Sequence, residues 1–303
     1  MNINKLIPLA FGLLMATGMA AIAGDESPTL AKIQGDKKIV IMNDLSAAPW
    51  QFRDANGNAA GFSIDLDRMI AARLDVDLEL RNVEWAGLIP GLLTRKSDIL
   101  ATSMTVTPKR AEQILFTQEN WYSTGVVAIV RSEDAGASWE DLNQSGKRIA
   151  VKAGTSAVDV AKQFFANAEI ESYPNDTDTY QALKTNRVDA ALNDLAVLGV
   201  VHREYGFQSL KKPRELISSD NWAFAVRKDD VGAQKYLDTF LAEIKANGKL
   251  EALRAYWVDG DDWKKDFLEK NSGVSDARKK LVEQLGIAAY VPESGKGTRA
   301  TLE

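Results

Sequence analysis

The stretch Asp98–Tyr122, DILATSMTVTPKRAEQILFTQENWY, carries the strongest information about fold and ligand. It reads as an apolar strand, a hydroxyl-rich turn and a helix that begins at Thr107, a preferred cap residue followed by proline. Arg110 lies in the first turn of that helix, where a cation is mildly unfavourable against the helix dipole. Its planar guanidinium, with hydroxyl groups of Ser103 and Thr105, predicts a clamp for a small carboxylate.

Strands and helices alternate on both sides of this stretch. Such alternation indicates a parallel sheet covered by helices on both faces. The pattern restarts after residue 125, so a second unit of similar build is expected. The expected strands are 38–43, 76–83, 99–103, 125–130, 148–152, 170–173, 188–192 and 222–226, and the expected helices are 63–74, 87–94, 156–165, 177–184, 194–205, 231–247 and 250–257.

We therefore predict an α/β fold of two lobes, each with a mostly parallel sheet, joined by two crossing segments. Lobe 1 comprises residues 24–124 and 221–260, and lobe 2 comprises residues 125–220. Residues 261–303 are expected to form a helical extension with a polar tail, which either packs on lobe 1 or makes a dimer contact. Small ligands bind in such interlobe clefts, at the carboxyl ends of the strands.

The amino-terminal residues have the pattern of a secretory signal peptide. Lys5 precedes an apolar run, and Ala-Ile-Ala ends at Ala23, where we expect cleavage. A membrane anchor is the alternative, but Pro8 interrupts the run and acidic residues follow it at once. We expect a periplasmic protein.

Composition excludes several kinds of chemistry. The chain has no cysteine, which excludes disulfides, thiolate metal sites and a lipid-modified cysteine. A net charge of −5 argues against nucleic acid as a partner. With His202 as the only histidine, neither a catalytic triad nor a histidine metal site can be built. We expect no metal and no cofactor.

Six segments in order carry a family resemblance: GFSIDLDRMIAARL, EWAGLIPGLLTRKSDILA, MTVTPKRAEQILFT, VKAGTS, VDAALND and WAFAVRKDD. No single segment is specific, but the series resembles the periplasmic solute-binding proteins of amino-acid ABC transporters, solute-binding protein family 3. The resemblance covers residue 38 to about residue 260. It implies the two-lobed type II periplasmic-binding-protein fold, closure around one small ligand, a monomer, and a membrane permease as partner.

The resemblance also implies roles for individual residues. Arg110 would pair with the α-carboxylate of an amino acid, and Ser103 and Thr105 would complete this clamp, although both hydroxyl residues are also ordinary turn formers. Asp194 would hold the α-ammonium, or act only as a helix cap. Independently of the family, the turn at Thr155 and Ser156 begins a helix, whose free N–H groups favour a carboxylate.

Aromatic residues and two charges would surround the ligand side chain. Trp85 matches a position that walls the ligand in the family, although core packing is its alternative role. The family often carries a second aromatic at Ala47; Trp50 would replace it or pack beneath the site.

Asp44 and Lys152 match positions that face the ligand's distal group. Together they would satisfy an amide, which favours a glutamine-like ligand. In the alternative, they neutralise each other across the closed cleft.

Two other functions fit the same scaffold. Periplasmic cyclohexadienyl dehydratases resemble these binding proteins and need a general acid in the cleft, for which a glutamate with a raised pKa would be the marker. The third possibility is a soluble ligand-sensing partner of a receptor. The retained Asp194 favours binding of a polar L-amino acid without catalysis.

Overall fold

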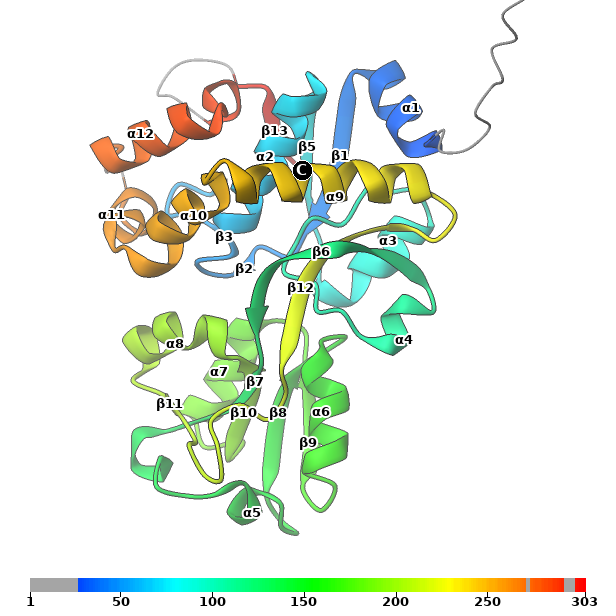
Figure 1. The fold of residues 1–303 in the computed structure, drawn as a ribbon. Helices are drawn as coiled ribbons and strands as arrows, with labels where there is room; N and C mark the ends of the chain where they lie inside the picture. Colours follow the sequence, from blue (N-terminus) through cyan, green and yellow to red (C-terminus); the bar gives the residue numbers. More distant parts are fainter. Residues whose placement is uncertain (1–26, 271–272, 292–297) are drawn as a thin grey trace, which may run out of the picture.

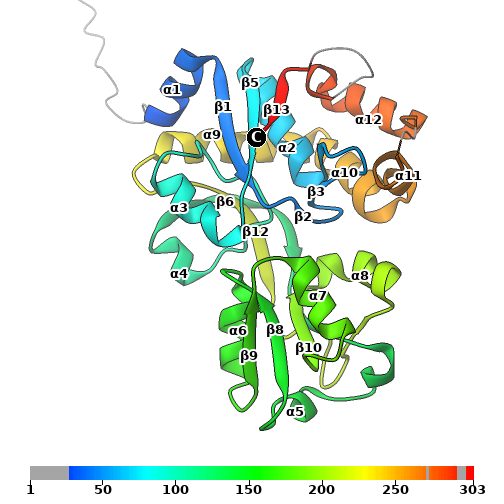
Figure 2. The same ribbon diagram turned by 180° about the vertical axis from the view of Figure 1, so that it is seen from behind.

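The computed structural model describes residues 27–270, 273–291 and 298–303. Two lobes are connected by the long strands β6 (Ile114–Thr124) and β12 (Asp220–Arg227), which cross from one lobe to the other (Figures 1 and 2). The two-lobed α/β fold predicted from the sequence is confirmed. The predicted signal peptide lies outside the described residues, and within these no helix is both long and apolar enough to cross a bilayer.

Lobe 1 is built around the parallel strands β1 (Lys38–Asn43) and β5 (Asp77–Asn82). Both faces of β1 are covered: Ile39 and Ile41 are fully buried on one face and Val40 and Met42 are buried on the other, so residues 39–42 are all apolar. A small antiparallel sheet lies beside this core. The other elements of the lobe are α1 (Pro28–Asp36), β2 (Ser46–Ala47), β3 (Gln51–Arg53), β4 (Ala59–Ala60), α2 (Phe62–Leu74), η1 (Trp85–Gly87), α3 (Leu88–Leu93), α9 (Val231–Ala246), α10 (Lys249–Arg254) and the π-helical turn η4 (Ala255–Asp259).

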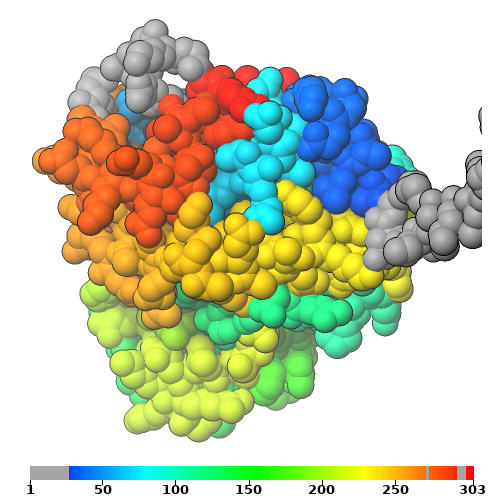
Figure 3. All heavy atoms as spheres, turned by 45° about the horizontal axis from the view of Figure 1, so that its top comes forward, coloured from blue at the N-terminus to red at the C-terminus, as the bar shows by residue number. Residues whose placement is uncertain are grey.

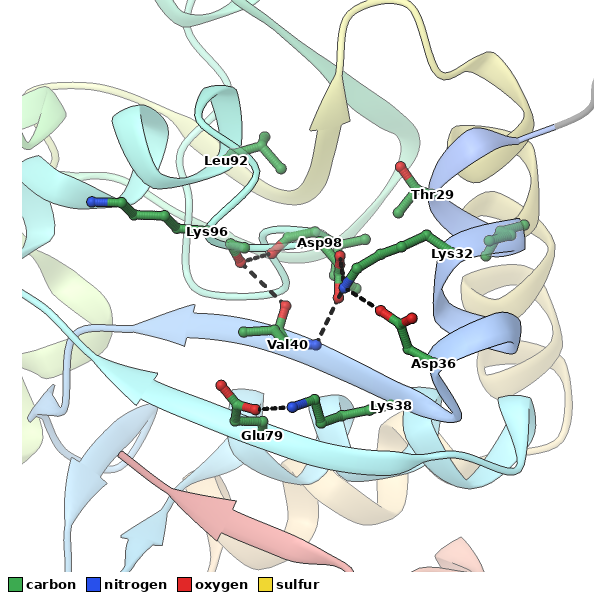
Figure 4. A network of polar contacts seen from close by, with 12 residues as sticks. Thr29, Lys32, Asp36, Lys38, Val40, Glu79, Leu92, Lys96 and Asp98 are labelled. Atoms are coloured by element: carbon green, nitrogen blue, oxygen red, sulfur yellow. Dashed lines mark hydrogen bonds and ion pairs between the residues drawn. The ribbon is translucent and has the colours of Figure 1, made fainter.

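The segment after α3 does not form the strand predicted at 99–103. Ile99 makes only an isolated bridge to Ile41 of β1. Just before it, the Asp98 side chain accepts a hydrogen bond from the Val40 backbone N–H at 2.8 Å (Figure 4). A carboxylate therefore replaces the backbone partner that a continuous strand would offer to β1.

The predicted helix at Thr107 is only one turn long, α4 (Pro108–Ala111), and the chain then enters β6. The strand was missed, although its aromatic and β-branched residues favour extended structure. It pairs with β12 in antiparallel register, Trp222 opposite Tyr122. Two register shifts in β12 bend this pair where it passes between the lobes.

Lobe 2 contains a mixed sheet of order β11-β7-β10-β8-β9, in which β10, β8 and β9 are parallel and β7 is antiparallel to β10. It encloses its own cluster of buried apolar residues. Its elements are β7 (Val126–Val130), η2 (Ser132–Asp134), α5 (Trp139–Leu142), β8 (Arg148–Lys152), α6 (Ser156–Phe164), β9 (Glu169–Tyr173), α7 (Asp176–Lys184), β10 (Ala190–Asp194), η3 (Leu195–Val197), α8 (Leu198–Tyr205) and β11 (Gln208–Ser209).

The carboxyl-terminal extension lies against lobe 1 and is not only helical. It contains α11 (Asp262–Leu268), α12 (Asp276–Leu285), η5 (Ala288–Tyr290) and the strand β13 (Ala300–Leu302). The polar tail predicted there contributes β13, which pairs in parallel with β5. Figure 3 shows the extension, orange to red, beside the cyan and yellow segments of lobe 1.

The extension is fixed by a buried ion pair. Arg278 of α12 is 1% exposed and pairs through both guanidinium nitrogens with Asp65 of α2, which is fully buried. Trp257 donates a further hydrogen bond to the same carboxylate at 2.9 Å. Burial alone would raise the pKa of Asp65, but the Arg278 guanidinium lowers it below its usual value.

Candidate functional site

A polar cavity of about 30 Å³ lies between the two lobes. It holds only a few water molecules, so the lobes are closed upon each other. Nine residues were predicted to contact the ligand. One of them, Asp44, is buried beside the cavity and does not line it. The walls contain the other eight predicted residues: Trp85, Ser103, Thr105, Arg110, Lys152, Thr155, Ser156 and Asp194.

Arg110 is held in the cavity wall by backbone carbonyls. Thr107 caps the short helix α4 by accepting a hydrogen bond from the Arg110 backbone N–H. This bond holds the backbone of Arg110 in place, from which its side chain extends. The guanidinium donates to Thr105 O at 2.7 Å and, across the cleft, to Gly154 O at 3.0 Å. Within the described residues Arg110 forms no ion pair, and burial lowers its pKa to about 10 although Asp194 opposes this shift.

Asp194 ends β10 and enters the same cavity from lobe 2. Its Oδ1 is buried and has no hydrogen-bond partner. The side chain does not cap η3, so the alternative role as a helix cap is not realised. Burial, together with the nearby Asp220 carboxylate, raises the pKa of Asp194 to about 7, although Arg110 acts in the opposite direction. The cavity thus contains a cation and an anion that the surrounding protein does not neutralise.

Lys152 marks the other end of the cavity, where the charges are paired. Its Nζ lies 2.9 Å from Asp44 Oδ2, 2.9 Å from Asp176 Oδ2 and 2.9 Å from Ser46 Oγ. Burial alone would lower the pKa of Lys152, but Asp176 and Asp44 together raise it. Of the two alternatives for Asp44 and Lys152, the structure therefore contains the mutual neutralisation across the closed cleft.

The predicted hydroxyl residues differ in what they offer. Ser103 Oγ accepts a hydrogen bond from the Gln51 side chain at 2.7 Å, which leaves its own proton available for donation. Ser156 Oγ and Thr105 Oγ1 are 3.5 Å apart across the cleft. The hydroxyl of Thr155 donates to a carbonyl within its own turn.

Three tryptophans line the cavity, and the two that were considered from the sequence do so in different ways. Trp85 is 7% exposed, and its ring lies 6.0 Å from the Arg110 guanidinium carbon and 5.4 Å from Lys152 Nζ. Trp50 is 1% exposed and packs edge-on against Trp222, so it lies largely beneath the site. Its indole N–H donates to Ala196 O of lobe 2 at 3.1 Å.

Some wall residues were not predicted from the sequence. Asp176 begins α7, shortly after β9 ends at Tyr173, so it lies near the carboxyl end of a strand, where ligands of such folds bind, and this signal was overlooked. Asn193 donates to Asp176 Oδ1 at 2.8 Å and orients that carboxylate. Gln51, Val197 and Trp222 are further unpredicted wall residues, whereas Ala47 and Trp50, which also line the wall, were considered from the sequence.

Gly154 allows the two lobes to approach closely. Its φ of +77° favours glycine. A Cβ added here would lie 3.0 Å from the Cα of Ala86 in lobe 1. A side chain at this position would therefore make the closed arrangement less favourable.

The sequence profile of the bacterial extracellular solute-binding proteins, family 3, matches residues 39–260. The chain belongs to this family. The histidine-binding periplasmic protein of Salmonella typhimurium is 26% identical over 255 residues, which cover 82% of this family 3 protein and 97% of that relative.

Solved structures agree with this assignment. The ancestral amino acid-binding protein AncCDT-1, a precursor of cyclohexadienyl dehydratase, has a TM-score of 0.70 at 29% identity, with 76% of this family 3 protein and 99% of that chain covered. An ancestral arginine-binding protein bound to glutamine has a TM-score of 0.68 at 28% identity, with coverage of 74% and 99%. The cleft cavity of this family 3 protein has no glutamate among its described wall residues.

Proposed function

We propose that this family 3 protein binds a zwitterionic L-amino acid in the cleft, with the α-carboxylate on Arg110 and the α-ammonium on Asp194. One observation carries the proposal: two opposite charges, one from each lobe, enter the same cavity, and among the described residues neither forms an ion pair. An amino acid supplies both missing charges in one molecule.

The same contacts explain why the ligand favours closure. A ligand shifts a conformational equilibrium only by its difference in affinity for the two states. Arg110 and Asp194 lie on different lobes, so one small molecule reaches both only when the lobes are together. Charge-assisted hydrogen bonds in this water-poor space are stronger than those of the open cleft.

For the ligand side chain we favour a polar, glutamine-like group. Lys152 already occupies the carboxylates at the far end of the cavity, and a cationic side chain would meet a like charge there. An amide accepts from Lys152 and donates to Asp176, which serves both partners. The similar ancestral protein with glutamine bound is consistent with this choice.

Location and partner follow from the family. The relative from Salmonella typhimurium is periplasmic, and we assign this protein to the same compartment, as a monomer that delivers its ligand to the permease of an ABC transporter. In this role the protein is a carrier and performs no chemistry.

A thermal-shift screen of the common amino acids, followed by titration calorimetry, tests the proposal. A ligand at 100 times its Kd adds about 2.7 kcal/mol of stability. Arg110→Ala is expected to weaken binding several hundredfold, because it leaves a desolvated carboxylate without a partner, at a cost of about 3 to 5 kcal/mol. The exposed Arg53 serves as a matched control, and Arg53→Ala should bind normally. Undiminished affinity in Arg110→Ala contradicts the assignment.

A second candidate function is a dehydratase of the cyclohexadienyl type. The specific observation in its favour is the pKa of Asp194, raised to about 7, which suits a general acid in the cleft. AncCDT-1, to which the chain is similar, is a precursor of such an enzyme. Incubation with prephenate or arogenate decides between the two: formation of an aromatic product supports the enzyme, and unchanged substrate supports the carrier.

A further inference from the structure

A second and larger cavity, of about 300 Å³, lies outside the ligand cleft. It is formed between α8 of lobe 2, the crossing strand β6, and the segment from η4 to α11; α8 lies next to α10 and α11 in both views of the ribbon (Figures 1 and 2). It shares no wall residue with the cleft cavity. Its volume lies at the lower end of the range of small-molecule sites.

The walls of this cavity are aromatic and aliphatic. Trp257 and Trp263 are 0% and 2% exposed, so their rings are held rigidly by the core. Tyr122 adds a third aromatic residue, and Leu195 and Val200 close the side formed by lobe 2. The two buried tryptophans fix the position of the wall, and its accessible apolar part, formed by Tyr122, Leu195 and Val200, suits a flat, largely apolar molecule.

Two cations, Arg203 and Lys264, complete the wall. The guanidinium carbon of Arg203 lies 5.5 Å from the centre of the Trp263 ring. The carboxylates that now contact these cations are themselves solvent-exposed: Glu204 at 46% and Asp261 at 83%. Exposed ion pairs contribute little free energy, so an incoming anion can replace them.

We propose that this cavity is a second binding site, for a small aromatic carboxylate. The ring lies against the partly exposed Tyr122, Leu195 and Val200, and the carboxylate is paired by Arg203 and Lys264. Since the walls come from both lobes, occupancy stabilises the closed arrangement. The carboxyl-terminal extension, which lies beyond the segment matched to the family, contributes Trp263 and Lys264 to the site.

Titration calorimetry with indole-3-acetate tests the proposal, with acetate and 3-methylindole as controls that lack the ring or the charge. Saturable 1:1 binding of indole-3-acetate, and weaker binding of both controls, is expected. Arg203→Gln should weaken indole-3-acetate binding about tenfold and leave 3-methylindole unchanged. Absence of binding at millimolar concentration, or an equal effect of Arg203→Gln on both molecules, overturns the proposal.

Gly199 offers a variant that fills the cavity. It lines the wall, and a Cβ added there meets no atom within 4 Å. Gly199→Leu also replaces glycine within a helix, which favours folding. This variant should keep its melting temperature or raise it and should lose indole-3-acetate binding; retained binding contradicts the assignment.

A second measurement, which rests on the proposed amino-acid binding, repeats the cleft titration in the presence of indole-3-acetate. The affinity for the amino acid should rise in the native protein and stay constant in Gly199→Leu. An unchanged amino-acid affinity in the native protein would show that the two sites are not coupled. The direct titration with indole-3-acetate decides separately whether the second site exists.

Discussion

Arg278 in the extension and Arg110 in the cleft are both buried, but they meet different partners. Arg278 forms a two-pronged pair with the carboxylate of Asp65. Arg110, of similar burial, donates only to carbonyl oxygens. The first cation has its counter-ion within the fold, and the second has a place for a counter-ion that the protein does not provide.

The matching carboxylates differ in the same way. Burial would raise the pKa of Asp65, but Arg278 and Arg68 together lower it, whereas burial raises the pKa of Asp194 to about 7. A buried charge with its partner indicates a structural anchor. A buried charge without a partner is costly to the free protein and indicates that something else binds there.

Removing Arg278 should have the largest effect on folding. Arg278→Met removes two charge-assisted hydrogen bonds from the buried Asp65 and leaves Arg68 as its counter-ion, so the free energy of unfolding should fall by about 3 kcal/mol. Urea denaturation measures this, with Lys280→Met on the exposed side of α12 as the matched control. A loss below about 1 kcal/mol would remove the distinction between the two arginines.

Asp194→Asn should weaken ligand binding and stabilise the ligand-free protein, whereas Arg278→Met should only destabilise the fold. Affinity for the amino acid should fall about a hundredfold, because the ammonium loses its carboxylate. The stability of the ligand-free protein should rise at pH 8, since a neutral amide no longer requires a buried charge.

The pH dependence follows from the raised pKa. The folded protein favours the protonated form of Asp194, and this preference stabilises the fold. The stabilisation is fully present below the unfolded pKa near 3.8 and is lost as the pH rises through about 7. The stability difference between variant and native protein should therefore be small at pH 4 and at most about 4 kcal/mol at pH 8. Thermal denaturation at several pH values checks this, and a constant difference would contradict it.

Lys152→Met should change selectivity more than overall binding. Without the ammonium, Asp44 and Asp176 present uncompensated negative charge to the ligand side chain. The ratio of arginine affinity to glutamine affinity should rise at least about tenfold. Calorimetry with both amino acids measures the ratio, and the exposed Lys162 provides a control, Lys162→Met.

Gly154→Ala is expected to have the smallest effect. The added methyl group would press on Ala86 of the opposite lobe and strain the positive φ, so closure becomes less favourable by about 1 kcal/mol. Affinity should fall about fivefold to tenfold for every ligand alike, without a change in selectivity. Gly136→Ala is the control, because a Cβ there meets nothing within 4 Å.

Local signals predicted much of the fold. The apolar segment KIVIMN forms β1 as expected, and Thr107 followed by proline does begin a helix. That helix ends after one turn because the pairing of β6 with β12, about 100 residues away, overrides its propensity. The strand expected at 99–103 failed for a related reason: the Asp98 side chain takes the place of a backbone partner, which no periodicity reveals.

The candidate site was predictable where a residue follows the end of a strand. Lys152 and Asp194, which were assigned from the family resemblance, end β8 and β10 and line the cavity, and Asp176 lies shortly after the end of β9. The pairing of Lys152 with Asp44 depends on how the lobes meet, which is a property of the closed arrangement and not of either segment.

The strand β13 has a consequence for the order in which lobe 1 is assembled. It pairs with β5, which lies roughly 220 residues earlier in the chain. A chain that emerges from a membrane translocase amino terminus first presents β5 long before β13, with one edge unpaired in the meantime. Lobe 2, whose strands are contiguous in sequence, needs no such delay. Protease accessibility of export-arrested chains would show the β5 edge protected last; earlier protection would contradict this order.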